Sequence, residues 1–380
     1  MAILKIALSK KTINLICRAI FFPLIILTVL YFCFPQTLRA DFRGHVASYW
    51  DKINSEFVQC KLCPRNCVIA DGQRGACTVR ISKGGTLYTL GYGNPVSIAI
   101  DPIEKKPFFH VAPGQRVFSL AVAGCNMRCL FCQNWQISQS KPDEVDSFKM
   151  SPEEIVDAAI RKKCNYIAYT YTEPIVFYEY MLDICKIAKA KGLKNTMHTC
   201  GYVNKEPLTE LLKYMDAVNV DLKAFSDKFY KKMGMMADLT PVLETIKTVK
   251  EKGVWLEITN LLIPGENDSP EEIRKMCVWI KENLGTEVPL HFSRFTPTFK
   301  LTNLPPTPVE KLKEARDIAM RTGLKYVYIG NVPGYTGENT QCPNCGKVVI
   351  ARRGYLVQEI NVENGKCKFC GYKIAGIWEK

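Results

Sequence analysis

Three cysteines lie within eight positions of the segment GCNMRCLFCQNW, at Cys125, Cys129 and Cys132. Their spacing is C-x3-C-x2-C, and the segment offers no fourth thiol. A disulfide needs a pair of cysteines and a structural zinc site takes four ligands, so three thiols are typical of a site with one open coordination position. A [4Fe–4S] cluster held by three thiolates has such an open iron. The alternative is a zinc site that takes its fourth ligand from elsewhere.

The chain contains 17 cysteines in 380 residues. Most of them fall in short C-x2-C or C-x3-C groups, which indicates metal or cluster binding in a reducing compartment and not a secreted disulfide scaffold. Lys and Arg outnumber Asp and Glu by 51 to 37, for a net charge of +14. We interpret this excess as a solvated basic surface, with docking to an acidic electron carrier or anionic lipid as the alternative. The sequence has no dense basic run interleaved with aromatic residues, so we expect no nucleic-acid partner.

An apolar run near the N-terminus, INLICRAIFFPLIILTVLYFCF at residues 13–34, is long enough to span a bilayer. Lys5, Lys10 and Lys11 precede the run, and no small-x-small cleavage site closes it. We therefore predict an uncleaved membrane anchor in place of a signal peptide. The flanking charges favour an N-terminus inside the cell, which would export the rest of the chain. Thiol and cluster chemistry favours the opposite orientation, with the core facing the cytoplasm.

Apolar strands alternate with capped helices from Arg116 onward. Two of the helices begin with the same letters, SPEEI, which combine a serine cap, a first-turn proline and a glutamate at the capping-box position. This alternation predicts βα units and a parallel sheet. About six units are too few for an eight-fold barrel, so we predict an α/β fold with a partial, open (β/α)6 barrel. The expected segments are an N-terminal region with the anchor (1–45), a Cys-rich segment (56–109), the barrel core (110–335) and a zinc-ribbon-like tail (340–380).

The Cys-rich segment carries four thiols with metal-ligand spacing. Cys60, Cys63, Cys67 and Cys77 form the pattern C-x2-C-x3-C-x9-C. Four thiolates complete either a zinc tetrahedron or an auxiliary iron–sulfur cluster. Two glycines before the last cysteine indicate a tight knuckle and favour zinc slightly, but both metals stay open.

The C-terminal tail carries a second group of four. Cys342, Cys345, Cys367 and Cys370 form paired C-x2-C knuckles, each followed by glycine, which is typical of a zinc ribbon. A rubredoxin-like iron site has the same ligands and is the alternative. We interpret the cysteines within the predicted strands and helices as buried free thiols: Cys164, Cys185, Cys200 and Cys277.

The C-x3-C-x2-C motif after an apolar strand resembles the signature of radical S-adenosylmethionine (SAM) enzymes, and Phe131 matches its aromatic position. Further segments make the resemblance more specific: CKLCPRNC, DPIEKKPFFH, TYTEP, VDLKAF, IPGENDS and YIGNVPG. Together they resemble the radical SAM component of the AmmeMemoRadiSam system, a group related to pyruvate formate-lyase activating enzymes. The resemblance runs from about residue 56 to the C-terminus and leaves out the predicted anchor.

The resemblance implies a reaction. The open iron would chelate SAM, and one electron from the cluster would cleave SAM reductively to a 5′-deoxyadenosyl radical that abstracts hydrogen from an unidentified substrate. One alternative is activation of a glycyl-radical enzyme, and a second is a non-catalytic, membrane-anchored zinc-binding adaptor. The implied partners are an electron donor such as flavodoxin or ferredoxin and a Memo-like protein.

The resemblance also implies cofactor-binding residues near the strand ends, in addition to Phe131. Glu173 in YTEP matches the acidic residue that holds the SAM amino group, with an exposed loop glutamate as the alternative. Asp221 and Lys223 in VDLK match a position facing SAM or substrate, with a solvated ion pair as the alternative. His198 and His291 are candidates to face the cavity, although a single histidine is more often structural.

Overall fold

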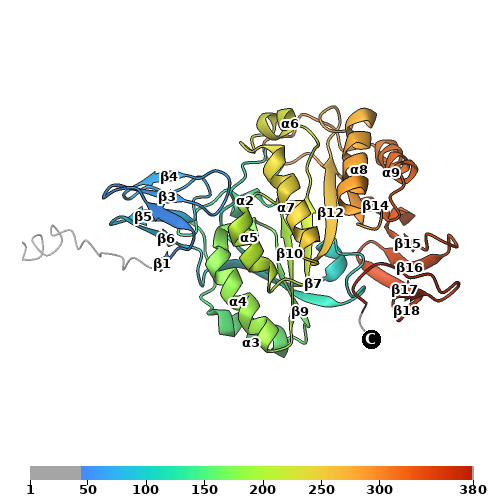
Figure 1. The fold of residues 1–380 in the computed structure, drawn as a ribbon, viewed down its shortest axis with the longest axis horizontal. Helices are drawn as coiled ribbons and strands as arrows, with labels where there is room; N and C mark the ends of the chain where they lie inside the picture. The colour runs from blue at the N-terminus through green and yellow to red at the C-terminus, as the bar shows by residue number, and fades with distance from the viewer. Residues whose placement is uncertain (1–43, 379–380) are drawn as a thin grey trace, which may run out of the picture. The chain divides into compact units, whose positions relative to one another are not determined.

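An eight-stranded sheet organises the part of the chain that the computed structural model describes, residues 44–378 (Figure 1). The predicted anchor at residues 13–34 lies outside the described residues. Within residues 44–378, no helix is both long and apolar enough to cross a membrane. The strands of the sheet, in chain order, are β7 (Pro95–Pro102), β8 (Arg116–Val122), β9 (Tyr166–Tyr169), β10 (Lys194–Thr199), β11 (Ala217–Asp221), β12 (Trp255–Leu262), β13 (Leu290–Arg294) and β14 (Val327–Gly330).

The strand order of this sheet is β14-β13-β12-β11-β10-β9-β8-β7, with β14 and β7 at its two edges. Strands β8 to β14 run parallel to their neighbours, whereas β7 pairs antiparallel with β8. The predicted α/β class is therefore confirmed. Strand β7 lies before residue 110, where the sequence analysis begins the core, so the sheet also draws on the Cys-rich segment.

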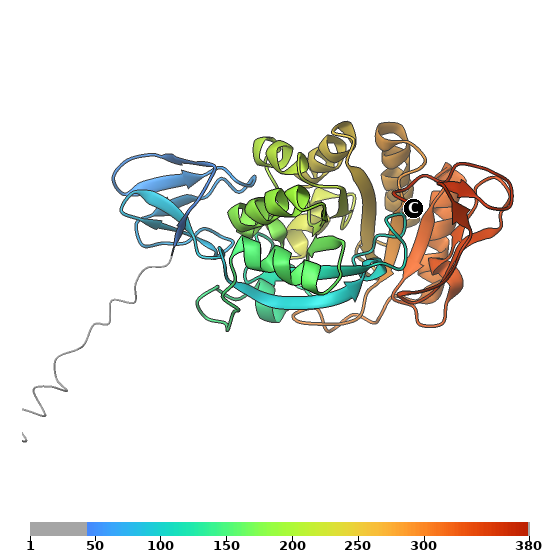
Figure 2. The same ribbon diagram turned by 90° about the horizontal axis from the view of Figure 1, so that it is seen from below.

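One long helix follows each of the strands β8 to β13, which gives the six βα units expected from the sequence. Because the strand order follows the chain and such crossovers are right-handed, the helices lie on one side of the sheet (Figures 1 and 2). These helices are α3 (Pro152–Arg161), α4 (Tyr178–Ala190), α5 (Lys205–Leu212), α7 (Leu239–Glu251), α8 (Pro270–Leu284) and α9 (Val309–Thr322). Short helices are α2 (Trp135–Ser138), α6 (Asp227–Lys232), η1 (Ile103–Lys105), η2 (Pro174–Phe177) and η3 (Thr336–Glu338).

The two SPEEI helices begin as their letters predict, but with one difference. At α3 the Ser151 hydroxyl accepts from the Glu154 amide at 3.2 Å, and the Glu154 carboxylate accepts from the Ser151 amide at 2.7 Å, which completes the capping box. At α8 the Ser269 hydroxyl caps the Glu272 amide at 3.2 Å. The Glu272 carboxylate, however, accepts from the Phe225 amide at 2.8 Å, so the second glutamate positions a neighbouring loop.

The Cys-rich segment folds as two small antiparallel sheets whose apolar residues belong to the main core. Val58, Ile69, Val79 and Leu87 are almost fully buried in the same cluster as the central strands. Arg80 is 1% exposed and forms an ion pair with Glu179 on α4. The segment is therefore anchored to the βα layers by apolar packing and a buried charge pair. The strands are β1 (His45–Val46), β5 (Arg80–Lys83) and β6 (Thr86–Thr89) in one sheet, and β2 (Trp50–Lys52), β3 (Phe57–Cys60) and β4 (Val68–Ala70) in the other. Strands β1 and β2 precede residue 56, where the sequence analysis begins the segment, so the two sheets also include residues before it.

The C-terminal tail is held against the sheet by buried polar groups. The Arg352 guanidinium donates to the Phe109 carbonyl at 2.6 Å. The two ring nitrogens of His110 lie 2.6 Å from the Ala375 carbonyl and 2.5 Å from the Tyr328 hydroxyl. The tail strands are β15 (Thr340–Gln341), β16 (Val348–Arg353) and β17 (Leu356–Ile360) in one sheet, and β18 (Val362–Glu363) and β19 (Lys366–Cys367) in another.

Gly124 provides a test of how closely the Cys-rich segment packs on the core. Its φ is +99°, and a Cβ there would lie 2.8 Å from the Cys77 carbonyl oxygen and clash with Val79. We expect Gly124→Ala to lower the free energy of unfolding by about 2–4 kcal/mol, through backbone strain and overpacking. Gly192→Ala is the matched control, because φ is +79° there but the added Cβ would meet nothing within 4 Å. Denaturant unfolding measures both changes. If the two variants lost the same free energy of unfolding, the close packing at Gly124 would be contradicted.

His110 should make the protein acid-sensitive. Burial lowers the pKa of its ring from 6.5 to about 4. Between these values the unfolded chain binds the proton more tightly, so stability falls as the pH is lowered from 6.5 towards 4. We expect His110 to contribute a loss of about 2 kcal/mol between pH 7 and pH 5, which His110→Gln should abolish. Unfolding at both pH values checks this, and an identical pH dependence in the variant would show that the neutral ring is not the cause.

Candidate functional site

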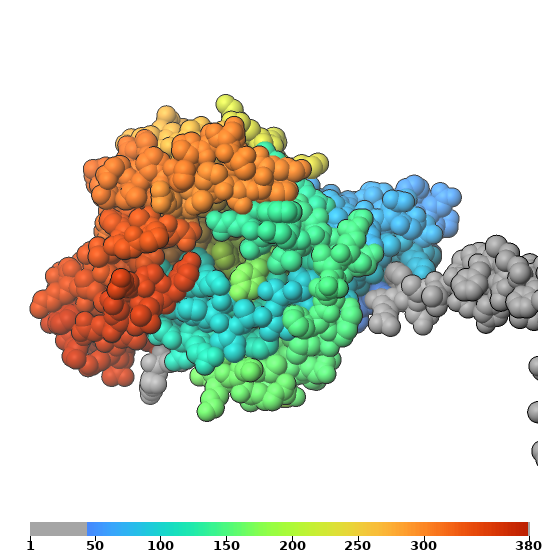
Figure 3. All heavy atoms as spheres, turned by 180° about the vertical axis from the view of Figure 1, so that it is seen from behind, coloured from blue at the N-terminus to red at the C-terminus, as the bar shows by residue number. Residues whose placement is uncertain are grey.

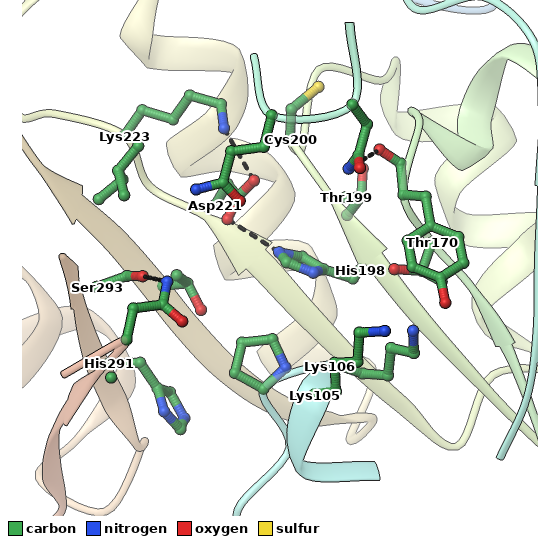
Figure 4. A pocket seen from close by; sticks show the side chains of 18 of the residues that line it. Lys105, Lys106, Thr170, His198, Thr199, Cys200, Asp221, Lys223, His291 and Ser293 are labelled. Atoms are coloured by element: carbon green, nitrogen blue, oxygen red, sulfur yellow. Dashed lines mark hydrogen bonds and ion pairs between the residues drawn. The ribbon is translucent and has the colours of Figure 1, made fainter. Parts of the chain in front are cut away.

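A cavity of about 440 Å³ lies at the carboxyl ends of the parallel strands (Figure 4). Figure 3 shows a hollow in this face, bordered by cyan, teal and orange-red segments. Carboxyl ends of parallel strands meet at one edge of a sheet, which is where open α/β sheets bind ligands. The lining includes all nine residues that the sequence assigns to the cluster and SAM: Cys125, Cys129, Phe131, Cys132, Glu173, His198, Asp221, Lys223 and His291.

The loop after β8 holds the three cysteines of the C-x3-C-x2-C motif. Cys129 is buried, whereas Cys125 and Cys132 are partly exposed. The Met127 amide donates to the Cys125 sulfur at 3.3 Å, and the Cys132 sulfur lies 3.1 Å from the Ser138 hydroxyl. Burial raises the pKa of the Cys129 thiol to about 12, so a thiolate at this position calls for a bound metal. Three thiols beside an open cavity fit a [4Fe–4S] cluster with one iron free for another ligand.

Glu173 joins the ends of β9 and β10 at the cavity. Its side chain is 2% exposed, which excludes the alternative of an exposed loop glutamate. The carboxylate accepts from the Thr199 hydroxyl at 2.6 Å, the Cys200 amide at 2.7 Å and the Ile175 amide at 3.2 Å. A carboxylate has about four lone-pair sites, so one acceptor position is left for a ligand.

Asp221 links His198 and Lys223 across the end of β11 (Figure 4). The Asp221 carboxylate lies 2.9 Å from His198 Nε2 and 2.8 Å from Lys223 Nζ. Burial would raise the pKa of Asp221, but the Lys223 ammonium and the His198 ring outweigh it and hold that pKa below its usual range. Asp221 also raises the pKa of Lys223 against the effect of burial. The pair is therefore ionised at the cavity wall and is not a solvated surface pair.

His291 borders the cavity but has a structural partner. Its Nε2 lies 2.6 Å from a Glu257 carboxylate oxygen, and its ring stacks on Tyr328 with centroids 5.0 Å apart. Glu257 also accepts from the Phe109 and His110 amides at 3.1 and 2.9 Å. The ring is thus held in place by a buried network, and among the candidates it has the strongest structural role.

The structure adds cavity residues that the sequence analysis did not assign. Lys106 is 1% exposed, pairs with Asp101 at 2.6 Å and lies 4.0 Å from the centre of the Tyr171 ring. Burial lowers the pKa of Lys106 to about 8. Lys105 also lines the cavity (Figure 4). Both lysines belong to the segment DPIEKKPFFH. Two adjacent charges between apolar residues were the signal in the sequence that could have identified them as site residues.

Cys200 is a second addition. Its thiol is buried, as the sequence analysis expects, but it lines the cavity and lies 3.6 Å from the Asn126 side-chain oxygen. The position follows β10 directly, so the strand assignment could have placed it there. Cysteines that pack only inside the core and those that reach a cavity look alike in the sequence.

The two groups of four cysteines differ in geometry. In the C-terminal group, the sulfurs of Cys342 and Cys370 are 3.6 Å apart and those of Cys345 and Cys367 are 3.8 Å apart. All four sulfurs lie within 4.8 Å of one another, which is close enough to bind one metal ion. The N-terminal group surrounds a small cavity between the Cys-rich segment and η2, lined by Cys60, Cys63, Cys67 and Cys77.

Comparison with known proteins places the motif in a superfamily. The sequence model of the Radical SAM superfamily matches residues 120–277. An uncharacterized protein of Methanocaldococcus jannaschii is 52% identical over 330 residues, which is 86% of this chain and 98% of that protein. The pyruvate formate-lyase-activating enzyme of Clostridium pasteurianum is 26% identical over 216 residues, 50% of this chain and 84% of that enzyme. The crystal structure of a radical SAM methyltransferase from Sphaerobacter thermophilus has a TM-score of 0.47 at 15% identity, over 79% of this chain and 83% of that one.

Asp221 should stabilise the cavity wall. Asp221→Asn would leave the ammonium of Lys223 partly buried without its carboxylate, and we expect the free energy of unfolding to fall by about 1–3 kcal/mol. The matched control is Asp143→Asn, because Asp143 pairs with Arg74 at 2.7 Å but is 58% exposed. That change should cost less than about 1 kcal/mol. Thermal unfolding of both variants measures these losses. A smaller loss of stability in Asp221→Asn than in Asp143→Asn would contradict the role of Asp221 in stabilising the cavity wall.

Proposed function

We propose that this chain, which belongs to the radical SAM superfamily, cleaves SAM reductively in the cavity at the ends of its parallel strands. The observation that carries this proposal is that all nine assigned residues line one cavity. These residues belong to five strands or to the loops that follow them, β8, β9, β10, β11 and β13, and they converge on one cavity. The alternative of a non-catalytic adaptor does not fit a chain of an enzyme superfamily with such a site.

The three motif cysteines would hold the cluster, and Phe131 of the same loop lines the cavity beside them. When bound, a [4Fe–4S] cluster supplies the single electron for SAM cleavage and an iron that is free to bind SAM. The loop keeps Cys129 away from solvent, and the Met127 amide donates to Cys125. Burial and amide hydrogen bonds are the means by which a protein adjusts the potential of such a group.

Glu173, Lys223 and Asp221 would orient SAM. The remaining acceptor site of Glu173 suits the SAM ammonium, because the other lone pairs already bind Thr199, Cys200 and Ile175. An ammonium has three donors, and Lys223 uses one of them on Asp221, so it can also donate to the carboxylate of SAM. Asp221 and His198 then face the remainder of the ligand.

Activation of a glycyl-radical enzyme is the second candidate function. The observation that favours it is the similarity to a pyruvate formate-lyase-activating enzyme over 84% of that enzyme's length. The family segments also support membership of the AmmeMemoRadiSam group, with a Memo-like protein as functional partner. A glycyl-radical signal on a partner protein mixed with the reduced enzyme would distinguish activation from reaction with a small molecule.

Three further assignments complete the proposal. A flavodoxin or ferredoxin would supply the electron, because SAM cleavage needs a low-potential donor. The close C-terminal thiols would hold zinc, since the sulfur separations suit tetrahedral coordination.

Residues 13–34 would anchor the chain in the membrane with its core towards the cytoplasm, because the run is long and apolar and SAM is made inside cells.

Cys129→Ala should abolish SAM cleavage. We expect protein purified without oxygen and reconstituted with iron and sulfide to form 5′-deoxyadenosine from SAM and dithionite, and the variant to form none, because the cluster loses one of its three ligands. The matched control is Cys164→Ala, which removes a buried thiol outside the cavity and should retain product formation. Equal product from Cys129→Ala and wild type would contradict the proposed site. The proposal would also be contradicted if wild-type protein with a loaded cluster formed no 5′-deoxyadenosine, either alone or with candidate partner proteins.

A further inference from the structure

The four thiols of the Cys-rich segment enclose a space that is not explained by the radical SAM site. Cys60 and Cys63 are buried, Cys67 and Cys77 are partly buried, and all four line one cavity. The rest of the lining is largely apolar, with Leu62, Ile69, Ile175 and Val176. The cavity is small, about 20 Å³, and its four thiols complete the ligand set of a metal site. We propose that these cysteines bind a second [4Fe–4S] cluster.

The separation of the sulfurs distinguishes a cluster from zinc. Zn–S bonds of about 2.3 Å place the sulfurs of a tetrahedral site about 3.8 Å apart, and the C-terminal group has this geometry, with pairs at 3.6 and 3.8 Å. Within residues 44–378, that group alone brings three or more Cys, His, Asp or Glu ligand atoms within 4.8 Å of one another. No three sulfurs of the N-terminal group are therefore this close.

The cysteines of the radical SAM loop share this wider spacing. A cubane binds each thiolate through a different iron, so its sulfur ligands are farther apart than those around one ion. The chain thus contains two kinds of cysteine group. The C-terminal four are compact and suit one metal ion, whereas the three cysteines of the radical SAM motif are farther apart and belong to a cluster motif. The N-terminal group resembles these three in lacking the compact arrangement, although the spacing in the sequence slightly favoured zinc.

Arg80 supplies the charge that a buried anionic cluster needs. Its side chain is 1% exposed and lines the cavity. Its Nη1 donates to the Cys60 sulfur at 3.8 Å and to the Ser48 carbonyl at 2.7 Å, while Nη2 pairs with Glu179. Its buried Nε has no hydrogen-bond partner among the described residues. Cluster sulfides and thiolates are hydrogen-bond acceptors, and such an acceptor would satisfy this donor.

The proposed cluster lies directly against the loop of the first one. Asn126, which follows Cys125, lines the N-terminal cavity. The Arg65 side chain, from the same cavity, donates to the Asn126 carbonyl at 2.6 Å. A Cβ on Gly124 would lie 2.8 Å from the Cys77 carbonyl. Residues on both sides of Cys125 therefore contact the second site.

Metal analysis of the full chain tests the proposal. Protein purified without oxygen, with zinc present, and reconstituted with iron and sulfide should contain about eight irons and about one zinc. The double variant Cys60→Ala/Cys63→Ala should lose about four irons and keep its zinc. The matched control, Cys342→Ala/Cys345→Ala, should lose the zinc and keep the iron. About four irons and about two zincs in the wild type would overturn the proposal.

A second measurement does not depend on the folding of those variants. The triple variant Cys125→Ala/Cys129→Ala/Cys132→Ala leaves the N-terminal site intact and should retain about four irons. After dithionite reduction it should show the electron paramagnetic resonance signal of a reduced [4Fe–4S] cluster. Complete loss of iron would overturn the proposal. Formation of 5′-deoxyadenosine by the wild type tests the SAM reaction separately, so the two can fail independently.

Discussion

The parallel hydrogen-bond ladder of the central sheet is the constraint on which the site depends. Between β10 and β11 it pairs His198 with Asn219, and between β12 and β13 it pairs Thr259 with His291. Because side chains alternate along a strand, Asn219 and Asp221 share a face, and Asp221 lies within 2.9 Å of His198. A shift of one residue in register would turn these side chains to the opposite face, towards the helices. The chemistry of the cavity is therefore fixed by backbone pairing before any ligand is present.

Much of this arrangement can be predicted from the sequence, because its signals are local. The motif cysteines, Glu173 and Asp221 each come at or just after the end of an apolar run, and the ends of parallel strands meet at one edge. The cap of α3 is likewise local, since Ser151 and Glu154 are one turn apart. Such features need only the order of strands and helices, which the alternation of apolar runs and caps provides.

Other features depend on contacts that no local pattern encodes. Strand β7 joins the sheet antiparallel and brings Lys105 and Lys106 to the cavity, although both lie outside the βα units. The structural role of His291 depends on Glu257, a residue of the adjacent strand. The cysteine groups show the same limit, because spacing in the sequence gives the number of thiols but not their separation in space. That separation is set by the turns and sheets that carry them.

The close contact at Gly124 has a consequence for how the molecule can be divided. The backbone of Gly124 lies against Val79 and the Cys77 carbonyl, so the loop that bears Cys125 has one of its walls built by the Cys-rich segment. Val79 and Leu87 belong to the same apolar cluster as the central strands. A fragment that began at the first βα unit would expose this apolar wall to water and lose the support of its loop. The barrel and the N-terminal sheets therefore share one apolar core, and a cut between them would divide that core.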